Sequence, residues 1–381
     1  MSAPCTHKGV CAVVRVFTLV LVAGALSLES KIPETAAKSG ESEMRIGVFG
    51  LFHPRVLRVT AVRGSTLMLR AGTEQILLET SAGTGGAAIS QTASGMLLIC
   101  SQRKIQSSGL VVSGRNGEPV DFELSVPGKI TRRFRGTLQI ISANDALVPI
   151  VTMDLETAVG SVVAAESLAD TPMEALKAQA VASRSYLVSG RGRHANFDFC
   201  DTTHCQFLRE PPTSESAVAK AVRATSGLVL SYESKPFPAM YTRSCSGQTR
   251  TPVQVGLTSG DYPYYSVACE YCRSHPARWT SRIASHEVGS LHSSDESSRM
   301  AVDRRLGWSA VESNDFTIRK EGDETVVEGT GLGHGIGLCQ AGARTMAEHG
   351  ASFQQILRHY YPNTNIVGWS GEVRAAASRL R

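Results

Sequence analysis

Short runs of alternating apolar and polar residues follow one another after residue 43. Four of them are separated by turns that contain Gly and Ser, namely Arg45–Phe49, Val56–Val62, Thr66–Arg70 and Gln75–Glu79. Alternation with a period of two is typical of half-buried strands, and several short strands between such turns predict an all-β module. We therefore assign residues 44–130 to a β-rich module, in which we find no catalytic constellation.

The period of the pattern changes after two further strand candidates, Arg132–Ile141 and Leu147–Val151. From Asp154 onward the chain is predicted to be helical, with Asp154 as the N-cap and the end of the helix near Glu166. Its apolar positions recur at helical spacing: Leu155, Val159, Val162 and Val163.

The helix with the clearest signals is predicted from Pro172 to about Ser189. Thr171 offers an N-cap hydroxyl, proline suits the first helical position, and Glu174 would complete a capping box. Gly190 then supplies the usual stop. The predicted buried stripe consists of Leu176, Ala180, Ser183 and Leu187.

Two further elements are predicted in the middle of the chain. Residues Glu215–Ser226 form an amphipathic pattern that ends at a glycine, which predicts a helix. Leu228–Tyr232 and Phe237–Thr242 are predicted to pair as a hairpin.

The last third holds a glycine-rich loop, Gly331–Gly337, which leads into a predicted helix over Leu338–His349. A short helix follows, and its start is marked by a second capping box formed by Ser352 and Gln355. The whole pattern predicts an α+β protein. In it, a mixed α+β domain over residues 131–370 follows the small N-terminal all-β module.

The N-terminus has the layout of a secretory signal, because His7, Lys8 and Arg15 precede the apolar run Val16–Leu28. This run is too short to span a membrane comfortably, so residues 1–28 are either a cleaved signal peptide or a weak anchor. Residues 29–43 form a linker rich in Ser, Glu and Lys. We expect an exported protein in the periplasm, in the cell wall or on the outer face of the cytoplasmic membrane, with membrane contact only through this segment.

Composition excludes several classes of protein. Apolar residues make up 42% and charged residues 19%, which is typical of globular proteins and not of disordered or fibrous ones. The net charge of +5 includes no block of consecutive Lys and Arg that is long enough to suggest a nucleic-acid arm, so no nucleic-acid partner is expected. A mild positive excess suits an anionic polymer such as cell wall, and it suits simple solubility equally well.

Four stretches together resemble the stage II sporulation protein D/amidase-enhancer (SpoIID/LytB) family. In chain order they are SVVAAES, MEALKAQAVASRSY, DFCDTTHCQ and GTGLGHGIGLCQAGA. The likeness covers roughly Arg132–Pro362 and leaves the N-terminal β module outside. Members of this family act on peptidoglycan, either as lytic transglycosylases on glycan strands without stem peptides or as modifiers that raise the activity of a cell-wall amidase.

The resemblance implies a catalytic role for Glu166, which lies just before the MEALKAQAVASRSY helix. Such a residue acts as acid and then as base, and it leaves 1,6-anhydro-muramyl ends. One carboxyl group suffices, so the lack of an obvious second carboxylate is compatible with this chemistry, unlike ordinary glycoside hydrolysis. A helix C-terminus and apolar surroundings would raise the pKa of Glu166, whereas Lys177 and Arg184 would lower it.

Further substrate-binding residues also follow from the resemblance. The basic pair proposed to line the family's cleft maps to Lys177 and Arg184. In the glycine-rich segment, His334 and Gln340 are expected to donate and accept hydrogen bonds with the glycan. The alternative for this loop is a tight turn that serves packing alone.

A first cluster of zinc ligands consists of His194, Cys200, His204 and Cys205. Two thiolates and two imidazoles suit tetrahedral zinc, and some members of the family carry a zinc near the cleft. A closed four-ligand site would be structural, whereas a site with only three protein ligands would be open and catalytic. A Cys200–Cys205 disulfide and unpaired core cysteines are the alternatives.

A second set of cysteines consists of Cys245, Cys269, Cys272 and Cys339. Four thiolates could close a second zinc site, and two disulfides are equally compatible with the sequence. The main expectation is thus a lytic transglycosylase acting on peptidoglycan glycan strands, with a structural zinc. The alternative function is a non-catalytic enhancer of a cell-wall amidase, for which Glu166 would be replaceable.

Overall fold

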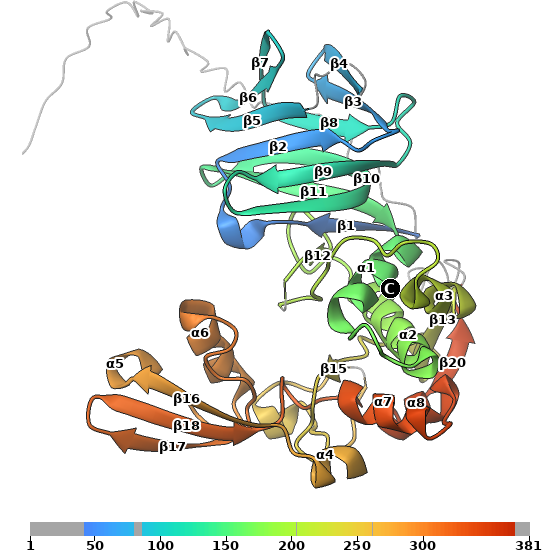
Figure 1. Ribbon diagram of the computed structural model, residues 1–381, viewed down its shortest axis with the longest axis vertical. Coiled ribbons are helices and arrows are strands. Elements are labelled where there is room, and N and C mark those ends of the chain that lie inside the picture. The colour runs from blue at the N-terminus through green and yellow to red at the C-terminus, as the bar shows by residue number, and fades with distance from the viewer. Residues whose placement is uncertain (1–41, 80–85, 203, 261, 370–381) are drawn as a thin grey trace, which may run out of the picture. The chain divides into compact units, whose positions relative to one another are not determined.

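The computed structural model describes residues 42–79, 86–202, 204–260 and 262–369 (Figure 1). The chain divides into two units, Met1–Lys38 and Ser39–Arg381, and all described residues belong to the second. The predicted signal or anchor over residues 1–28 and nearly all of the predicted linker lie outside the described residues. Within those residues, no helix is both long and apolar enough to cross a bilayer.

Twelve strands form one sheet, in which the order of neighbours is β12-β1-β11-β10-β9-β2-β5-β6-β7; β8 joins β10 to β3, which pairs with β4. The strand bounds are β1 (Glu43–Gly47), β2 (Val56–Ala61), β3 (Thr66–Ala71), β4 (Glu74–Glu79), β5 (Gly86–Thr92), β6 (Gly95–Cys100), β7 (Arg103–Ser107), β8 (Gly109–Ser113), β9 (Val120–Val126), β10 (Ile130–Ala143), β11 (Ala146–Asp154) and β12 (Phe199–Cys200).

Alternation of side chains explains why these segments become strands. In β3, Leu67, Leu69 and Ala71 are buried while the residues between them are only partly covered, as predicted for a half-buried strand. The predicted boundary between residues 130 and 131 falls at the first residue of β10. Strands β10 and β11 pair over seven residues and continue the same sheet, so this sheet extends to Asp154.

Helix α1 (Leu155–Glu166) starts where β11 ends. The carboxylate of Asp154 accepts a hydrogen bond from the backbone N–H of Thr157 at 2.9 Å, which confirms the predicted N-cap. Helix α2 (Met173–Ser189) follows, and Gly190 is its C-cap as predicted. The mixed α+β class is therefore confirmed.

The capping box predicted at the start of α2 is wrong. Pro172 is the N-cap, and it offers no side-chain cap. The carboxylate of Glu174 instead accepts hydrogen bonds from Lys177 Nζ at 2.6 Å and from the backbone N–H of Phe353 at 2.8 Å. A tertiary contact with the start of another helix thus replaces the local one.

A buried ion pair holds the two helices together. Arg184 in α2 has no exposed side-chain surface, and its Nε and NH2 groups donate to the two carboxylate oxygens of Glu156 in α1 at 2.8 and 2.6 Å. Its NH1 group also donates to the carbonyl of Leu228, and the N–H of Gly227 donates to Glu156. One guanidinium therefore connects α1, α2 and the strand that begins at Leu228.

The C-terminal part surrounds α2 with short elements. Their bounds are α3 (Ala217–Ala224), β13 (Leu228–Tyr232), β14 (Lys235–Pro236), β15 (Tyr241–Thr242), β19 (Leu338–Cys339), α7 (Gln340–Glu348), α8 (Phe353–Tyr360) and β20 (Asn365–Gly368). The predicted capping box of α8 is confirmed. The predicted hairpin is wrong in its second arm, because β13 pairs with β14 and β20, while β15 pairs in parallel with β19.

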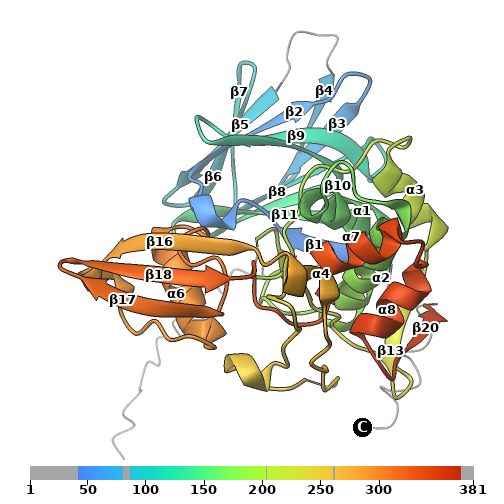
Figure 2. The ribbon, with the colours of Figure 1, turned by 60° about the horizontal axis from the view of Figure 1, so that its bottom comes forward.

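An additional small sheet was not predicted. It consists of β16 (Arg278–Ala284), β18 (Glu324–Thr330) and β17 (Phe316–Glu321), with α4 (Glu270–Ser274) before it and α5 (Ser285–Val288) and α6 (Glu296–Leu306) between its strands. Figure 2 shows the three strands side by side with α6 next to them. The sheet has its own core, formed around Trp279, Val302, Phe316 and Val327.

Substituting Arg184 by Ala should lower the free energy of unfolding by about 3 kcal/mol or more, because the carboxylate of Glu156 and the carbonyl of Leu228 lose a buried partner. Urea unfolding followed by circular dichroism would measure this change. Lys177→Ala is the matched control, since it removes a more exposed i,i+3 pair with Glu174 and should cost less than about 1 kcal/mol. Equal effects of the two substitutions would contradict the central role of Arg184.

Candidate functional site

Glu166 is the last residue of α1 and lines a pocket of about 380 Å³. The other lining residues come from segments that are distant in sequence: the turn after α1, helix α2, residues near Arg243 and Tyr271, and helix α7. Helix α1 has a buried apolar face against the sheet, so its C-terminus is held in place by packing. The pocket therefore presents one carboxyl group from a rigid element.

Burial is the main influence on this carboxyl group. Desolvation raises the pKa of Glu166 from its usual value to about 7, although the N–H of Phe207 and the positive charges of Arg243 and Arg209 lower it in part. The group is thus divided between its acid and base forms near neutral pH. A residue that must first give and then take a proton works best with such a pKa.

Gln340, for which the resemblance implies a role in substrate binding, lies beside Glu166. Its side-chain amide donates hydrogen bonds to the backbone carbonyl of Glu166 and to the side chain of Gln179, both at 3.3 Å. These contacts connect the start of α7 with the end of α1 and with α2. Gln340 also lines the pocket, so its orientation is fixed next to the carboxyl group.

The cations near Glu166 are not the predicted pair. Arg243 lines the pocket and forms no ion pair with any described residue. The positive charges of Arg243 and Arg209 both lower the pKa of Glu166. Sequence reasoning missed both, because neither belongs to the MEALKAQAVASRSY helix. In the sequence, the one indication of their role is their position. Arg243 directly follows the predicted strand Phe237–Thr242, and Arg209 lies shortly after the DFCDTTHCQ stretch.

The structure places Lys177 and Arg184 elsewhere. Arg184 is fully buried in its pair with Glu156, so the expected contact with a sugar is not available. Lys177 pairs with Glu174, lies 5.9 Å from the ring of Phe353, and is not among the residues that line the pocket. Their seven-residue spacing put them on one side of α2, but packing of α1 and α8 gives them different environments.

His334 and its loop have a packing role in this structure. The ring Nδ1 of His334 accepts a hydrogen bond from the N–H of Ile336 at 3.0 Å, and burial lowers the pKa of the imidazole. Gly337 has φ of +72°, and a Cβ there would lie 2.0 Å from the carbonyl oxygen of Met240. At this position the loop passes too close to neighbouring backbone for any residue except glycine. His334 does not line the pocket.

The first predicted ligand cluster does assemble. His194, Cys200, His204 and Cys205 bring one nitrogen or sulfur each to within 4.8 Å of one another. Cys205 Sγ lies 3.3 Å from His194 Nε2 and 3.5 Å from His204 Nδ1, and Cys200 Sγ lies 3.8 Å from His204 Nδ1. Zinc bonds of about 2.0–2.3 Å in a tetrahedron put ligand atoms about 3.3–3.8 Å apart. The four side chains therefore fit zinc, and the described cysteines are all free thiols.

This cluster is connected to the pocket through the backbone. Phe207, whose N–H interacts with the Glu166 carboxylate, lies two residues after Cys205. The N–H of Arg209 donates to the carbonyl of Ser161 in α1, and Arg132 donates to the carbonyl of Leu208. Any ion held by the cluster would thus brace the segment that contacts the carboxyl group.

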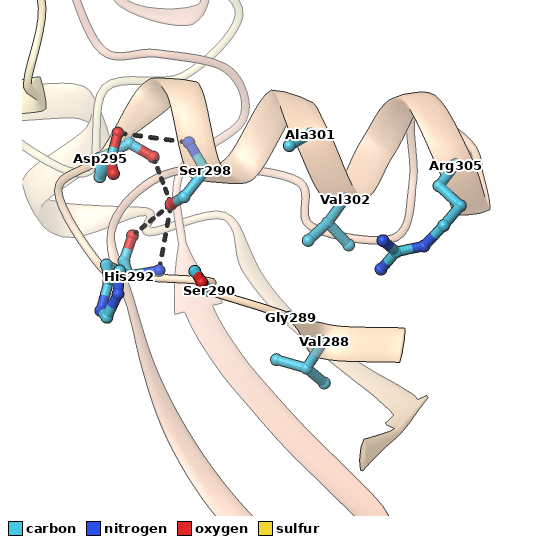
Figure 3. Close-up of a pocket in the computed structure, with 9 residues that line it drawn as sticks. All are labelled: Val288, Gly289, Ser290, His292, Asp295, Ser298, Ala301, Val302 and Arg305. Atoms are coloured by element: carbon cyan, nitrogen blue, oxygen red, sulfur yellow. Dashed lines mark hydrogen bonds between the residues drawn. The ribbon is translucent and has the colours of Figure 1, made fainter. Parts of the chain in front are cut away.

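A second pocket, of about 280 Å³, lies between α5 and α6 (Figure 3). Its polar groups serve the start of α6: Asp295 Oδ1 accepts from the N–H of Ser298, while Ser298 Oγ donates to the carbonyl of His292. Because these groups satisfy one another, they do not converge on a ligand. The pocket beside Glu166 is therefore the better candidate site.

Comparisons with known proteins point to one family. A sequence model of the SpoIID family, described as stage II sporulation protein, matches residues 143–232. An uncharacterized protein of Brachyspira hyodysenteriae is 30% identical over 270 residues, which cover 62% of this chain and 73% of that protein. Stage II sporulation protein D of Bacillus amyloliquefaciens is 25% identical over 57% of this chain and 75% of its own length. The amidase enhancer of Bacillus subtilis is 38% identical over 64 residues, 17% of this chain and 9% of that protein.

Glu166→Gln should change how stability depends on pH. In the wild type the unfolded carboxyl group ionises near pH 4.5, whereas the folded one ionises near pH 7. Wild-type stability relative to E166Q should therefore fall as pH rises from about 4.5 to about 7, by on the order of 3 kcal/mol at about 1.4 kcal/mol per pKa unit. Urea unfolding at pH 4.5, 6 and 8 would measure the difference, and parallel profiles would contradict the raised pKa.

Proposed function

The chain belongs to the stage II sporulation protein D/amidase-enhancer family, and we propose that it cleaves peptidoglycan glycan strands as a lytic transglycosylase, with Glu166 as its acid and base. The family supports a role related to the cell wall. The observation that carries the finer proposal is the carboxyl group of Glu166, which faces a pocket of about 380 Å³ with a pKa of about 7.

The first step requires the protonated form of Glu166. Its proton passes to the glycosidic oxygen, the bond between this oxygen and the sugar's C1 breaks, and positive charge develops on the sugar ring. Burial raises the pKa of Glu166 to about 7, so about half of the Glu166 carboxyl groups are protonated at neutral pH and can act as the acid. The leaving sugar departs with a new hydroxyl group.

The second step uses the carboxylate that the first step leaves. It takes the proton from the sugar's own 6-hydroxyl as that oxygen bonds to C1 and closes the 1,6-anhydro ring. The proton balance returns to its starting point, and no water is consumed. Glu166 also stabilises the developing positive charge as it becomes negative.

Arg243 and Gln340 would orient the substrate. Arg243 is an exposed cation on the pocket wall without an ion-pair partner among the described residues, so it suits the lactyl carboxyl group of muramic acid or another anionic group of the wall polymer. Gln340 holds the backbone at Glu166 and offers its remaining amide capacity to sugar hydroxyl groups. Neither residue needs to exchange a proton.

A second carboxylate on the same pocket, Glu348, provides the test against ordinary hydrolysis. Its Oε1 accepts a hydrogen bond from Arg344 Nε at 2.8 Å, and Arg344 also binds Asp170 with two hydrogen bonds. An inverting hydrolase would require a second carboxylate to activate water. A transglycosylase would not require Glu348.

The His194/Cys200/His204/Cys205 cluster would hold a structural zinc ion. All four ligands come from the protein, which leaves no open position for water or substrate. Its contribution would be to fix the segment from Cys200 to Arg209, and thereby the N–H of Phe207 beside Glu166. The ion itself would take no part in proton transfer.

The alternative is a non-catalytic enhancer of a cell-wall amidase. It is supported by the match to a protein named amidase enhancer, although that match covers only 64 residues. Under this alternative the pocket would dock a wall component or a partner enzyme. Glu166→Gln would then leave the stimulation of the amidase unchanged.

Wild type, E166Q and E348Q should be incubated with glycan strands that lack stem peptides, and the products analysed by mass spectrometry. We expect 1,6-anhydro-ended fragments from wild type and E348Q, and a rate about 10²–10⁴-fold lower for E166Q because the general acid is lost. Above pH 7 the wild-type rate should fall, since the acid form disappears.

The opposite results are equally informative. Reducing ends from wild type, lost in both E166Q and E348Q, would indicate a two-carboxylate hydrolase. Intact strands from all three proteins, with an amidase stimulated equally by wild type and E166Q, would indicate the enhancer.

Cys205→Ser should lower the thermal midpoint by several °C and speed trypsin cleavage after Arg193 and Arg209, because the ion that braces this segment is lost; both arginines are already exposed, so the rate reports how firmly their backbone is held. Cys100→Ser is the matched control, since Cys100 is buried in β6 outside any ligand cluster. Differential scanning calorimetry and limited proteolysis would measure both effects. A C205S protein with an unchanged midpoint but no turnover would instead favour an open, catalytic metal.

A further inference from the structure

Four cysteines from three separate segments converge at one buried point. They are Cys245, which follows β15, Cys269 and Cys272 at α4, and Cys339 in β19. Their sulfur atoms all lie within 4.8 Å of one another, and none of the four residues is more than 2% exposed. Outside the His194 cluster, no other described group of potential ligands is as compact.

The spacing of the sulfur atoms fits a single tetrahedral ion. Cys272 Sγ and Cys339 Sγ are 3.5 Å apart, while zinc–sulfur bonds of about 2.3 Å give edges of about 3.8 Å. A disulfide would need about 2.05 Å, and all four thiols are free. We propose that Cys245, Cys269, Cys272 and Cys339 bind a second, structural zinc ion, distinct from the one assigned to the His194 cluster.

Hydroxyl groups next to the sulfurs suit thiolate ligands. Ser244 Oγ lies 3.4 Å from Cys272 Sγ, and Tyr360 Oη lies 3.5 Å from Cys269 Sγ. Donation from these hydroxyls would offset part of the negative charge of four thiolates around Zn²⁺. Gly342 makes room for this arrangement, because a Cβ there would lie 2.1 Å from Tyr360 Oη and 2.5 Å from Cys269 Sγ.

The backbone around the ligands is also shaped for chelation. Cys269 is the N-cap of α4, and Cys272 lies on its first turn, so the C-x-x-C spacing brings both sulfurs to one side. After Cys245 the chain turns through Gly247, whose φ of +97° lies in the left-handed region. The N–H of Cys269 then donates to the carbonyl of Gly247 at 3.0 Å, which joins the two ligand segments.

The position of this site explains what it would do. Each of the three ligand segments also carries a residue that lines the pocket beside Glu166: Arg243, Tyr271 and Gln340. One ion that binds all three segments would therefore fix the part of the pocket wall that these residues form.

The test is metal content, which requires no assay of activity. The full chain, purified with zinc and a reductant, should contain two zinc ions by inductively coupled plasma mass spectrometry. Cys272→Ser and Cys205→Ser should each contain one, the double variant none, and the control Cys100→Ser two. Because C205S removes only the ion of the His194 cluster, failure of that assignment is distinguishable from failure of this one.

A second measurement, the absorption of the Co²⁺-loaded protein, reports the number of thiolate ligands directly. Wild type loaded with Co²⁺ should show charge-transfer absorption from six thiolates, whereas C205S should retain the signature of a Co²⁺ ion with four thiolates. One zinc ion in the wild type, lost completely in C205S, would overturn the proposal. Disulfides among the four cysteines, found by alkylation and mass spectrometry of the unreduced protein, would overturn it as well.

Discussion

The guanidinium of Arg184 is the constraint on which the candidate site depends. It lies in the core without exposed surface, so its charge must be compensated where it stands, and the bidentate contact with Glu156 and the carbonyl of Leu228 achieves this. The pair joins the first turn of α1 to α2, and the buried apolar face of α1 continues this attachment along the helix. Glu166 is the last residue of α1, so its location depends on both contacts.

The chemistry of Glu166 results from two opposing influences. Burial removes water from the carboxyl group and raises its pKa, while Arg243, Arg209 and the N–H of Phe207 stabilise its charged form. Burial has the larger effect on the pKa of Glu166, which is therefore raised to about 7. This balance requires segments that lie far apart in the sequence to meet around one side chain, and the two proposed zinc ions would hold such segments in place.

Local signals in the sequence predicted much of the fold. The caps at Asp154 and Ser352 and the alternating strands at the N-terminus depend on neighbouring residues, and the structure confirms them. The failures came from tertiary contacts. Glu174 does not complete a capping box because the N–H of Phe353, 179 residues away, binds its carboxylate. The segment Phe237–Thr242 does not complete a hairpin because β15 finds a parallel partner in β19.

By itself the sequence determined which residue types are available for chemistry: a glutamate at the end of a helix, a glutamine in a glycine-rich segment and two sets of four possible metal ligands. Only the tertiary structure decided which of them share a site. In the folded chain Arg184 is buried and Lys177 forms an ion pair with Glu174, whereas Arg243 lines the pocket. The physical reason is that burial, ion pairing and pKa depend on groups that are close in space, and helical periodicity says nothing about which distant element covers a given face.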